Sequence, residues 1–142
     1  MSKYLKYGEY FLFSIMFVII LIIIVRFLYF NGIGRQEQVK SLLKTIYENE
    51  ESYYNKHFYF TKDFKIVVPN GTCKYYFYSV YFADNICEGN NIYRNPNKIN
   101  PFINKNSYLI VAIGNIDSDD TLDIWSLNEK GDLKHIQNDL FR

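Results

Sequence analysis

Hydrophobic positions form one continuous block near the N-terminus. Residues Phe11–Val25 read FLFSIMFVIILIIIV, and thirteen of these fifteen are Phe, Leu, Ile or Val. With its flanks, the block extends from Tyr10 to Phe30, which gives about 30 Å of helix and matches the hydrocarbon thickness of a bilayer. Arg26 is near one end, where its long side chain can reach the interface. The pattern predicts a transmembrane helix over residues 10–30, preceded by a short N-terminal segment over residues 1–9.

A cleaved secretory signal and the buried core helix of a soluble protein are the alternatives for this block. A signal needs a small-x-small cleavage site, but Arg26-Phe27-Leu28-Tyr29 follows the apolar run. A core helix would normally show a polar face, and no residue from 11 to 25 is charged. We therefore expect an uncleaved, single-pass membrane anchor.

Two glycines, Gly32 and Gly34, follow the span. Each weakens a helix by about 1 kcal/mol relative to alanine, so the pair predicts a kink, hinge or local melt. Within residues 31–60 the chain then shows the spacing of an amphipathic helix. Its inward stripe consists of Val39, Leu42, Leu43, Ile46, Glu50, Tyr53 and Tyr54. Its polar face consists of Gln36, Glu37, Lys40, Ser41, Lys44, Glu48 and Glu51.

Residues 61–142 change to strand patterns and turn signals. The region 84–105, rich in Asn, Pro and Gly, reads as a loop, and Asn128-Glu129-Lys130-Gly131 as a hairpin turn. The predicted strands are Phe64–Val68, Cys73–Phe82, Ser107–Ile113, Thr121–Leu127 and Asp132–Ile136. The expected fold class is α+β, with a long N-terminal helix packed on a small C-terminal antiparallel sheet.

Two cysteines, Cys73 and Cys87, are a candidate disulfide pair, with two buried free thiols as the alternative. Their bond would close a loop of about fifteen residues and would suit an oxidising compartment. This favours a cytoplasmic N-terminus and an extracytoplasmic C-terminal domain.

The low net charge and the lack of catalytic motifs in the sequence argue against several classes of function. The net charge is +1, so we expect no nucleic-acid partner. His57 and His135 are far apart in the sequence, without companion ligands nearby, and are expected at the surface or at an edge. The sequence has no Ser/His/Asp or Cys/His arrangement with a supporting motif, no phosphate-binding glycine loop and no HExxH. We therefore expect a protein that is not an enzyme.

An acidic run follows the predicted strand at 107–113. Asn115, Asp117, Asp119 and Asp123 occupy positions 1, 3, 5 and 9 of a calcium-loop pattern, with the Thr121 carbonyl at position 7. However, Asp120 replaces the turn glycine and Ser126 replaces the bidentate glutamate, which excludes a complete EF-hand. A Ca²⁺ site and a polar turn that caps its own backbone both remain open.

Three features resemble the type IV pilin and type II secretion pseudopilin superfamily. One is the order of an apolar helix, an amphipathic continuation and a small antiparallel sheet. A second is Arg35–Tyr47 followed by Glu51–Tyr54, which is similar to an LKxIYxxxxSYY pattern in the soluble half of the pilin helix. The third is Ala112–Trp125, which is similar to the GNxDxDxxxDxW segment of bacterial pilin sheets.

The resemblance implies a structural subunit of a type IV pilus or a secretion pseudopilus, anchored in a bacterial inner membrane. Its partners would be membrane lipid, other pilin-like subunits and an assembly platform. Pilin leaders end in Gly, and a nearby Glu neutralises a neighbour's N-terminal amine. Gly8 is the candidate cleavage position and Glu9 the candidate assembly charge. The register departs from the family, because Glu9 directly follows Gly8. A membrane-tethered binding module of pilin ancestry is the alternative function.

Overall fold

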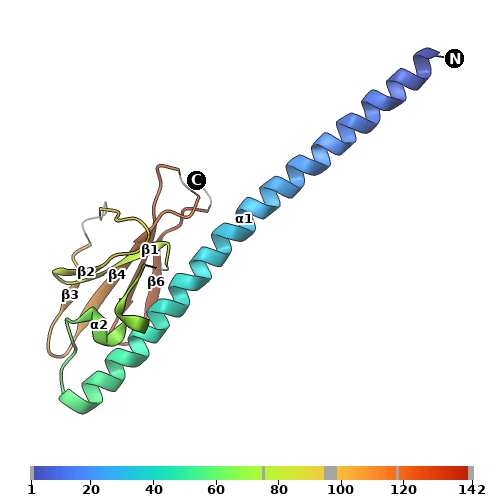
Figure 1. Ribbon diagram of the computed structural model, residues 1–142. Coiled ribbons are helices and arrows are strands. Elements are labelled where there is room, and N and C mark those ends of the chain that lie inside the picture. The colour runs from blue at the N-terminus through green and yellow to red at the C-terminus, as the bar shows by residue number, and fades with distance from the viewer. Residues whose placement is uncertain (1, 75, 95–98, 118, 141–142) are drawn as a thin grey trace.

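The fold is dominated by one helix that extends far beyond a small sheet domain (Figure 1). This computed structural model describes residues 2–74, 76–94, 99–117 and 119–140. Helix α1 (Ser2–His57) has 56 residues, about 84 Å of helix. Its N-terminal half projects freely, and its C-terminal half lies along the sheet. Near the N-terminus, α1 is long and apolar enough to cross a membrane by length and composition.

The expected interruption at Gly32 and Gly34 is absent, because α1 continues through both glycines. Gly32 instead lies where α1 meets the C-terminal segment. A Cβ at this position would be 2.5 Å from Leu140 Cδ2, so the missing side chain permits close packing. A Cβ at Gly34 would meet nothing within 4 Å. Close packing against Leu140 therefore explains why position 32 is a glycine. No contact explains the glycine at position 34.

The C-terminal half of α1 supplies the apolar layer that covers the sheet. Val39, Leu43 and Ile46 are fully buried, as their helical spacing predicted. Glu50 is also fully buried on this stripe. Gln36 was wrongly placed on the polar face, because its side chain is only 7% exposed. Gln36 is seven residues, about two turns, before Leu43, so the buried stripe starts earlier along α1 than hydrophobicity alone indicated.

An antiparallel sheet forms the second layer. Its strands are β1 (Tyr78–Phe82), β2 (Asn85–Cys87), β3 (Phe102–Ile103), β4 (Tyr108–Gly114), β5 (Asp123–Asn128) and β6 (Leu133–Gln137). Their order is β2-β1-β4-β5-β6, and β3 pairs with the start of β4. The predicted strands at 107–113, 121–127 and 132–136 are confirmed as β4, β5 and β6 within two residues at each end.

Both faces of β4 are buried, which explains its nearly continuous apolar sequence. Ile110 and Ala112 belong to the main core beneath α1. Val111 and Ile113 face the other way, where Ile124 and side chains such as Tyr93 pack against them. The segment that follows β2 therefore covers the outer face of the sheet. Within the predicted loop 84–105, the structure places the short strands β2 and β3.

The predicted strand at 64–68 is wrong, because Phe64–Val67 forms the short helix α2. The Asp63 carboxylate accepts a hydrogen bond from the Lys65 N–H at 3.0 Å and caps this helix. Pro69 then begins the 3-10 turn η1 (Pro69–Gly71). Capping and the following proline outweigh the strand preference of Ile66 and Val67. The predicted strand at 73–82 is confirmed only over β1.

Cys73 and Cys87 are paired as a disulfide, with Cα atoms 5.5 Å apart. Both side chains are buried, at 1% exposure. The bond attaches the segment after η1 to the edge strand β2. This confirms the pairing predicted from the sequence.

Replacing both cysteines, Cys73→Ser with Cys87→Ser, should lower the free energy of unfolding by about 3 kcal/mol, because the unfolded chain regains loop entropy. The measurement is denaturant unfolding of the full chain in detergent, followed by the fluorescence of its one tryptophan. Reductant should reproduce the loss in the wild type and leave the double variant unchanged. A wild type that is insensitive to reductant would contradict a stabilising bond.

Candidate functional site

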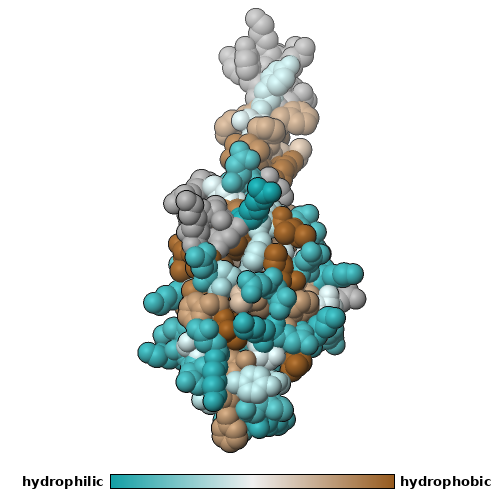
Figure 2. Space-filling view, turned by 90° about the vertical axis from the view of Figure 1, so that its left-hand side faces the viewer, coloured by the Kyte–Doolittle hydropathy of each residue, from teal (hydrophilic) through white to brown (hydrophobic). Residues whose placement is uncertain are grey.

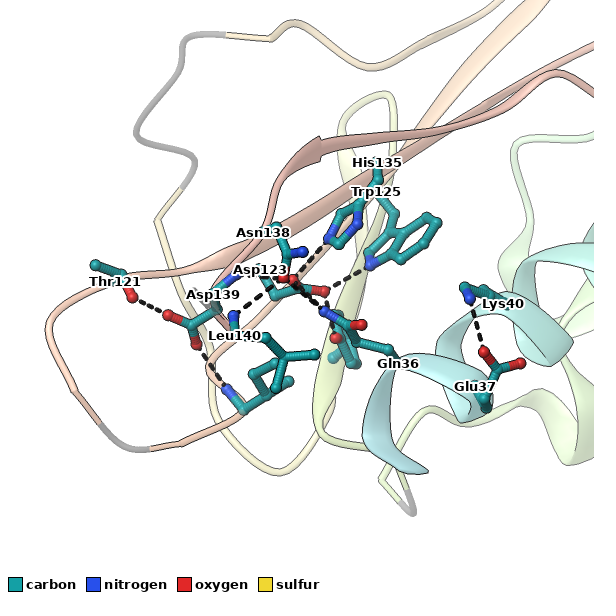
Figure 3. Close-up of polar contacts among 12 residues, drawn as sticks. Gln36, Glu37, Lys40, Thr121, Asp123, Trp125, His135, Asn138, Asp139 and Leu140 are labelled. Atoms are coloured by element: carbon teal, nitrogen blue, oxygen red, sulfur yellow. Dashed lines mark hydrogen bonds and ion pairs between the residues drawn. The ribbon is translucent and has the colours of Figure 1, made fainter. Parts of the chain in front are cut away.

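A buried carboxylate, Asp123, joins α1 to the sheet. It begins β5, is fully buried and accepts five hydrogen bonds (Figure 3). The donors are Gln36 Nε2 (2.9 Å), Tyr78 OH (2.6 Å), Trp125 Nε1 (2.6 Å), His135 Nε2 (2.7 Å) and the Asp139 N–H (3.2 Å). They come from α1, β1, β5, β6 and the C-terminal segment. Multiple donors compensate the cost of burying this carboxylate, and they rule it out as a surface ligand.

Strand geometry directs Asp123 inward. Alternate residues of a strand face the same side, so Asp123 shares the α1 side with Trp125 and Leu127. All three are at least 95% buried. The Trp125 ring stacks on His135 with centroids 3.8 Å apart, which extends this layer into β6. His135 is therefore on an edge strand, as expected, but its partly buried ring also joins the network around Asp123.

An acidic loop connects β4 to β5 beside the part of α1 around Asn31 and Arg35. Carboxylate oxygens of Asp117, Asp119 and Asp139 lie within 4.8 Å of one another. Asp139 is fully buried and accepts the Ile116 N–H at 3.0 Å. Its burial raises the pKa of Asp139 to about 6, reinforced by the neighbouring aspartates. Oxygen ligands in such a cluster are the type that hard divalent cations prefer.

The structure brings together only part of the predicted calcium set. Asp117 and Asp119 belong to the cluster, but Asp123 is committed to the buried network and cannot serve as position 9. Asn115 Nδ2 donates to the Asp119 carbonyl, and the Thr121 N–H and hydroxyl donate to Asp119 Oδ1. These bonds follow the alternative of a self-capping turn. They also lower the pKa of Asp119 through the two bonds from Thr121. A bound cation stays a prediction.

Asp139 is the residue that sequence reasoning missed. It is far along the chain from the acidic run, and its C-terminal segment reaches this loop only through the fold. Besides accepting the Ile116 N–H, Asp139 contacts the Thr121 hydroxyl oxygen, which also contacts Asp119. In the sequence it is one acidic residue close to the C-terminus, and aspartate at such a position is ordinarily exposed.

A second buried carboxylate, Glu50, lies on α1 near the other end of the domain. One oxygen accepts the Thr61 N–H at 3.1 Å. The other oxygen, and the nearby hydroxyl of Tyr108, have no hydrogen-bond partner within the described chain. Burial raises the pKa of Glu50 to about 7, although the bond from Thr61 favours the charged form. Burial and nearby carboxylates, Glu50 first, also raise the pKa of Tyr108.

The candidate assembly residues lie at the start of α1. Gly8 and Glu9 are in its first helical turns, and the side chain of Glu9 lies outside the described part of the structure.

No family model, no curated protein and no solved structure matches this chain. Its function is therefore inferred from the molecule itself.

Asp123→Asn should destabilise the domain by about 3 kcal/mol or more, because an amide NH2 would face donors that now bind a carboxylate. Asp120→Asn is the matched control, since Asp120 is exposed in the neighbouring loop. The measurement is denaturant unfolding followed by tryptophan fluorescence. Equal stability of the two variants would contradict the central role of Asp123.

Glu50 should make the domain less stable as pH rises. Its folded pKa near 7 lies above its ordinary value of 4.5, so the contribution is full below pH 4.5 and is lost as pH rises through 7. Between pH 5 and 8 we expect the melting temperature to fall by several degrees. Glu50→Gln should remove the slope above pH 6 and leave the part due to Asp139 below it. Glu48→Gln, an exposed control, should keep the wild-type profile.

Proposed function

We propose that this chain is a pilin-like structural subunit, held in a membrane by the N-terminal half of α1 and assembled through that same half with other subunits. The observation that carries the proposal is the division of α1. Its apolar half has no cover from the rest of the described chain, whereas its second half is built into the domain. The side chains described between Tyr10 and Phe30 are all exposed, many by half or more, for example Phe11 at 66%.

The exposed apolar part of α1, residues 10–30, is called the stem below, and it needs an apolar environment. It is apolar on every side, so a monomer in water would leave the whole surface hydrated. Figure 2 shows brown and tan side chains along the stem above a domain with many teal ones. Membrane lipid or the stems of other copies are the environments that would cover it. The disulfide supports a domain outside the cytoplasm.

The resemblance to pilins and pseudopilins supports assembly over simple anchoring. The alternative is a membrane-tethered binding module that does not enter a filament. The residues around Gly8 favour this alternative, because Glu9 follows Gly8 directly and a cut there would leave no glutamate a few residues further on.

The two functions differ in processing and in the effect of Glu9. As a pilin-like subunit, protein recovered from membranes and from sheared cell surfaces should have lost Met1–Gly8 by intact mass, or Met1–Lys3 if Glu9 is aligned with the glutamate of the pilin family, which places the cut after Lys3. Glu9→Gln should reduce the sheared, assembled fraction about tenfold while the membrane pool persists, since one neutralising charge pair is lost.

Glu88→Gln is the matched control, because Glu88 is an exposed glutamate directly after β2 and lies outside the stem. It should leave the assembled fraction at the wild-type level. A full-length mass, together with an absent sheared fraction, would overturn the subunit proposal and favour the tethered module.

A further inference from the structure

A groove with a basic rim lies on one flank of the domain. It has a volume of about 630 Å³ and lies between α1 and the β5–β6 hairpin. Tyr47, Leu127 and Leu133 give it an apolar lining. The Tyr47 ring closes against the hairpin turn, where a Cβ on Gly131 would be 3.2 Å from its Cζ. The charged lining residues are Glu37, Lys40, Lys44 and Lys130.

Two of the three lysines in the groove make no close ion pair within the described chain, so their charges can interact with a partner. Lys40 is engaged, because its Nζ is 2.6 Å from Glu37 and faces the Trp125 ring at 5.3 Å. Lys44 is 76% exposed and reaches Glu48 only at 4.0 Å. Lys130 is exposed at the hairpin turn, and the described residues place no carboxylate in an ion pair with it. The groove therefore favours an acidic occupant with some apolar surface.

The same chain presents an acidic surface on the opposite flank of α1. Asp117, Asp119 and Asp120 are exposed in the β4–β5 loop, and Asp119 accepts bonds that fix its shape. This loop lies beside Asn31 and Arg35 of α1. In Figure 3 the Lys40–Glu37 pair and Thr121 of the acidic loop are at opposite ends of the view.

Helix geometry fixes how the two surfaces are related. Arg35, beside the loop, and Lys44, in the groove, are nine residues apart on α1. At 100° and 1.5 Å per residue, they differ by about 180° around the helix and about 14 Å along it. The acidic loop is the surface nearer to the apolar stem. A single copy cannot bring the two together, but two copies side by side can.

We propose that the lysine-lined groove of one copy receives the acidic β4–β5 loop of a second copy, whose stem runs parallel but is displaced away from the membrane by about 14 Å. The proposal rests on the subunit function above and names its domain interface. Different surfaces meet in this contact and each step adds a displacement. It therefore repeats without closing, which produces an open filament.

The displacement also makes the contact selective for assembled protein. Two copies whose spans cross the same bilayer are held at one level by the hydrocarbon thickness. Their loops and grooves are then out of register. The contact becomes available when one stem has moved outward along its neighbour, so copies stored in the membrane do not pair through it.

Charge reversal in the full chain tests the contact. In detergent, where copies can slide, amine-independent crosslinking should give a ladder of oligomers for the wild type. Lys44→Glu with Lys130→Glu should weaken the ladder about tenfold, and so should Asp117→Lys with Asp120→Lys. Combining all four changes in one chain, or mixing the two double variants, should restore it. Lys62→Glu with Lys65→Glu, exposed lysines outside the groove, should have no effect.

The outcomes separate this interface from the subunit function. A wild-type ladder that persists equally in both reversed variants overturns the proposed contact and leaves self-assembly intact. Absence of a ladder in every chain overturns both. EDTA is present in every sample, so that no divalent cation bridges the acidic loops of two copies. Unchanged tryptophan fluorescence shows that each variant is folded.

A cysteine pair tests the displacement. Chains carrying Lys130→Cys are mixed with chains carrying Asp120→Cys and oxidised. An intermolecular disulfide should form in detergent and fall about tenfold in flat lipid bilayers, where the spans are level. Equal yields in both environments would overturn the displaced arrangement.

Discussion

The hydrogen bonds to the Asp123 carboxylate are the constraint on which the arrangement of helix and sheet depends. A buried carboxylate is tolerated only when hydrogen-bond donors surround it. Here the side-chain donors come from α1 and from the strands β1, β5 and β6. Gln36 attaches the part of α1 next to its exposed apolar half to this point, and His135 attaches the edge strand. The network therefore sets how the stem leaves the domain, which hydrophobic packing alone would leave less specific.

The same network separates structure from surface chemistry in the acidic run. Asp117 and Asp123 belong to one short polar stretch, yet one is exposed and the other completely buried. The turn between β4 and β5 makes this division, because its backbone is capped by the outward carboxylates. What remains on the surface is a shaped, negatively charged loop that neighbouring molecules can contact.

Continuity of α1 connects the two environments of the protein. The helix passes from an exposed apolar stem to a buried amphipathic half without a break, and Gly32 permits the C-terminal segment to pack at the junction. The domain consequently follows the stem as one body over its packed half. A rigid connection of this kind converts a displacement of the stem into an equal displacement of the groove and the acidic loop.

The sequence by itself determined the apolar stem, the amphipathic half and three of the strands, because each depends on local periodicity. It offered the disulfide pair as a candidate, which the structure confirmed. The sequence also indicated that Asp123 is buried, because alternate strand residues face the same side and Trp125 and Leu127 are apolar. The tertiary structure decided which polar residues are buried. Gln36, His135 and Asp139 meet Asp123 from distant parts of the chain, and hydrogen bonds between such segments leave no periodic pattern in the sequence.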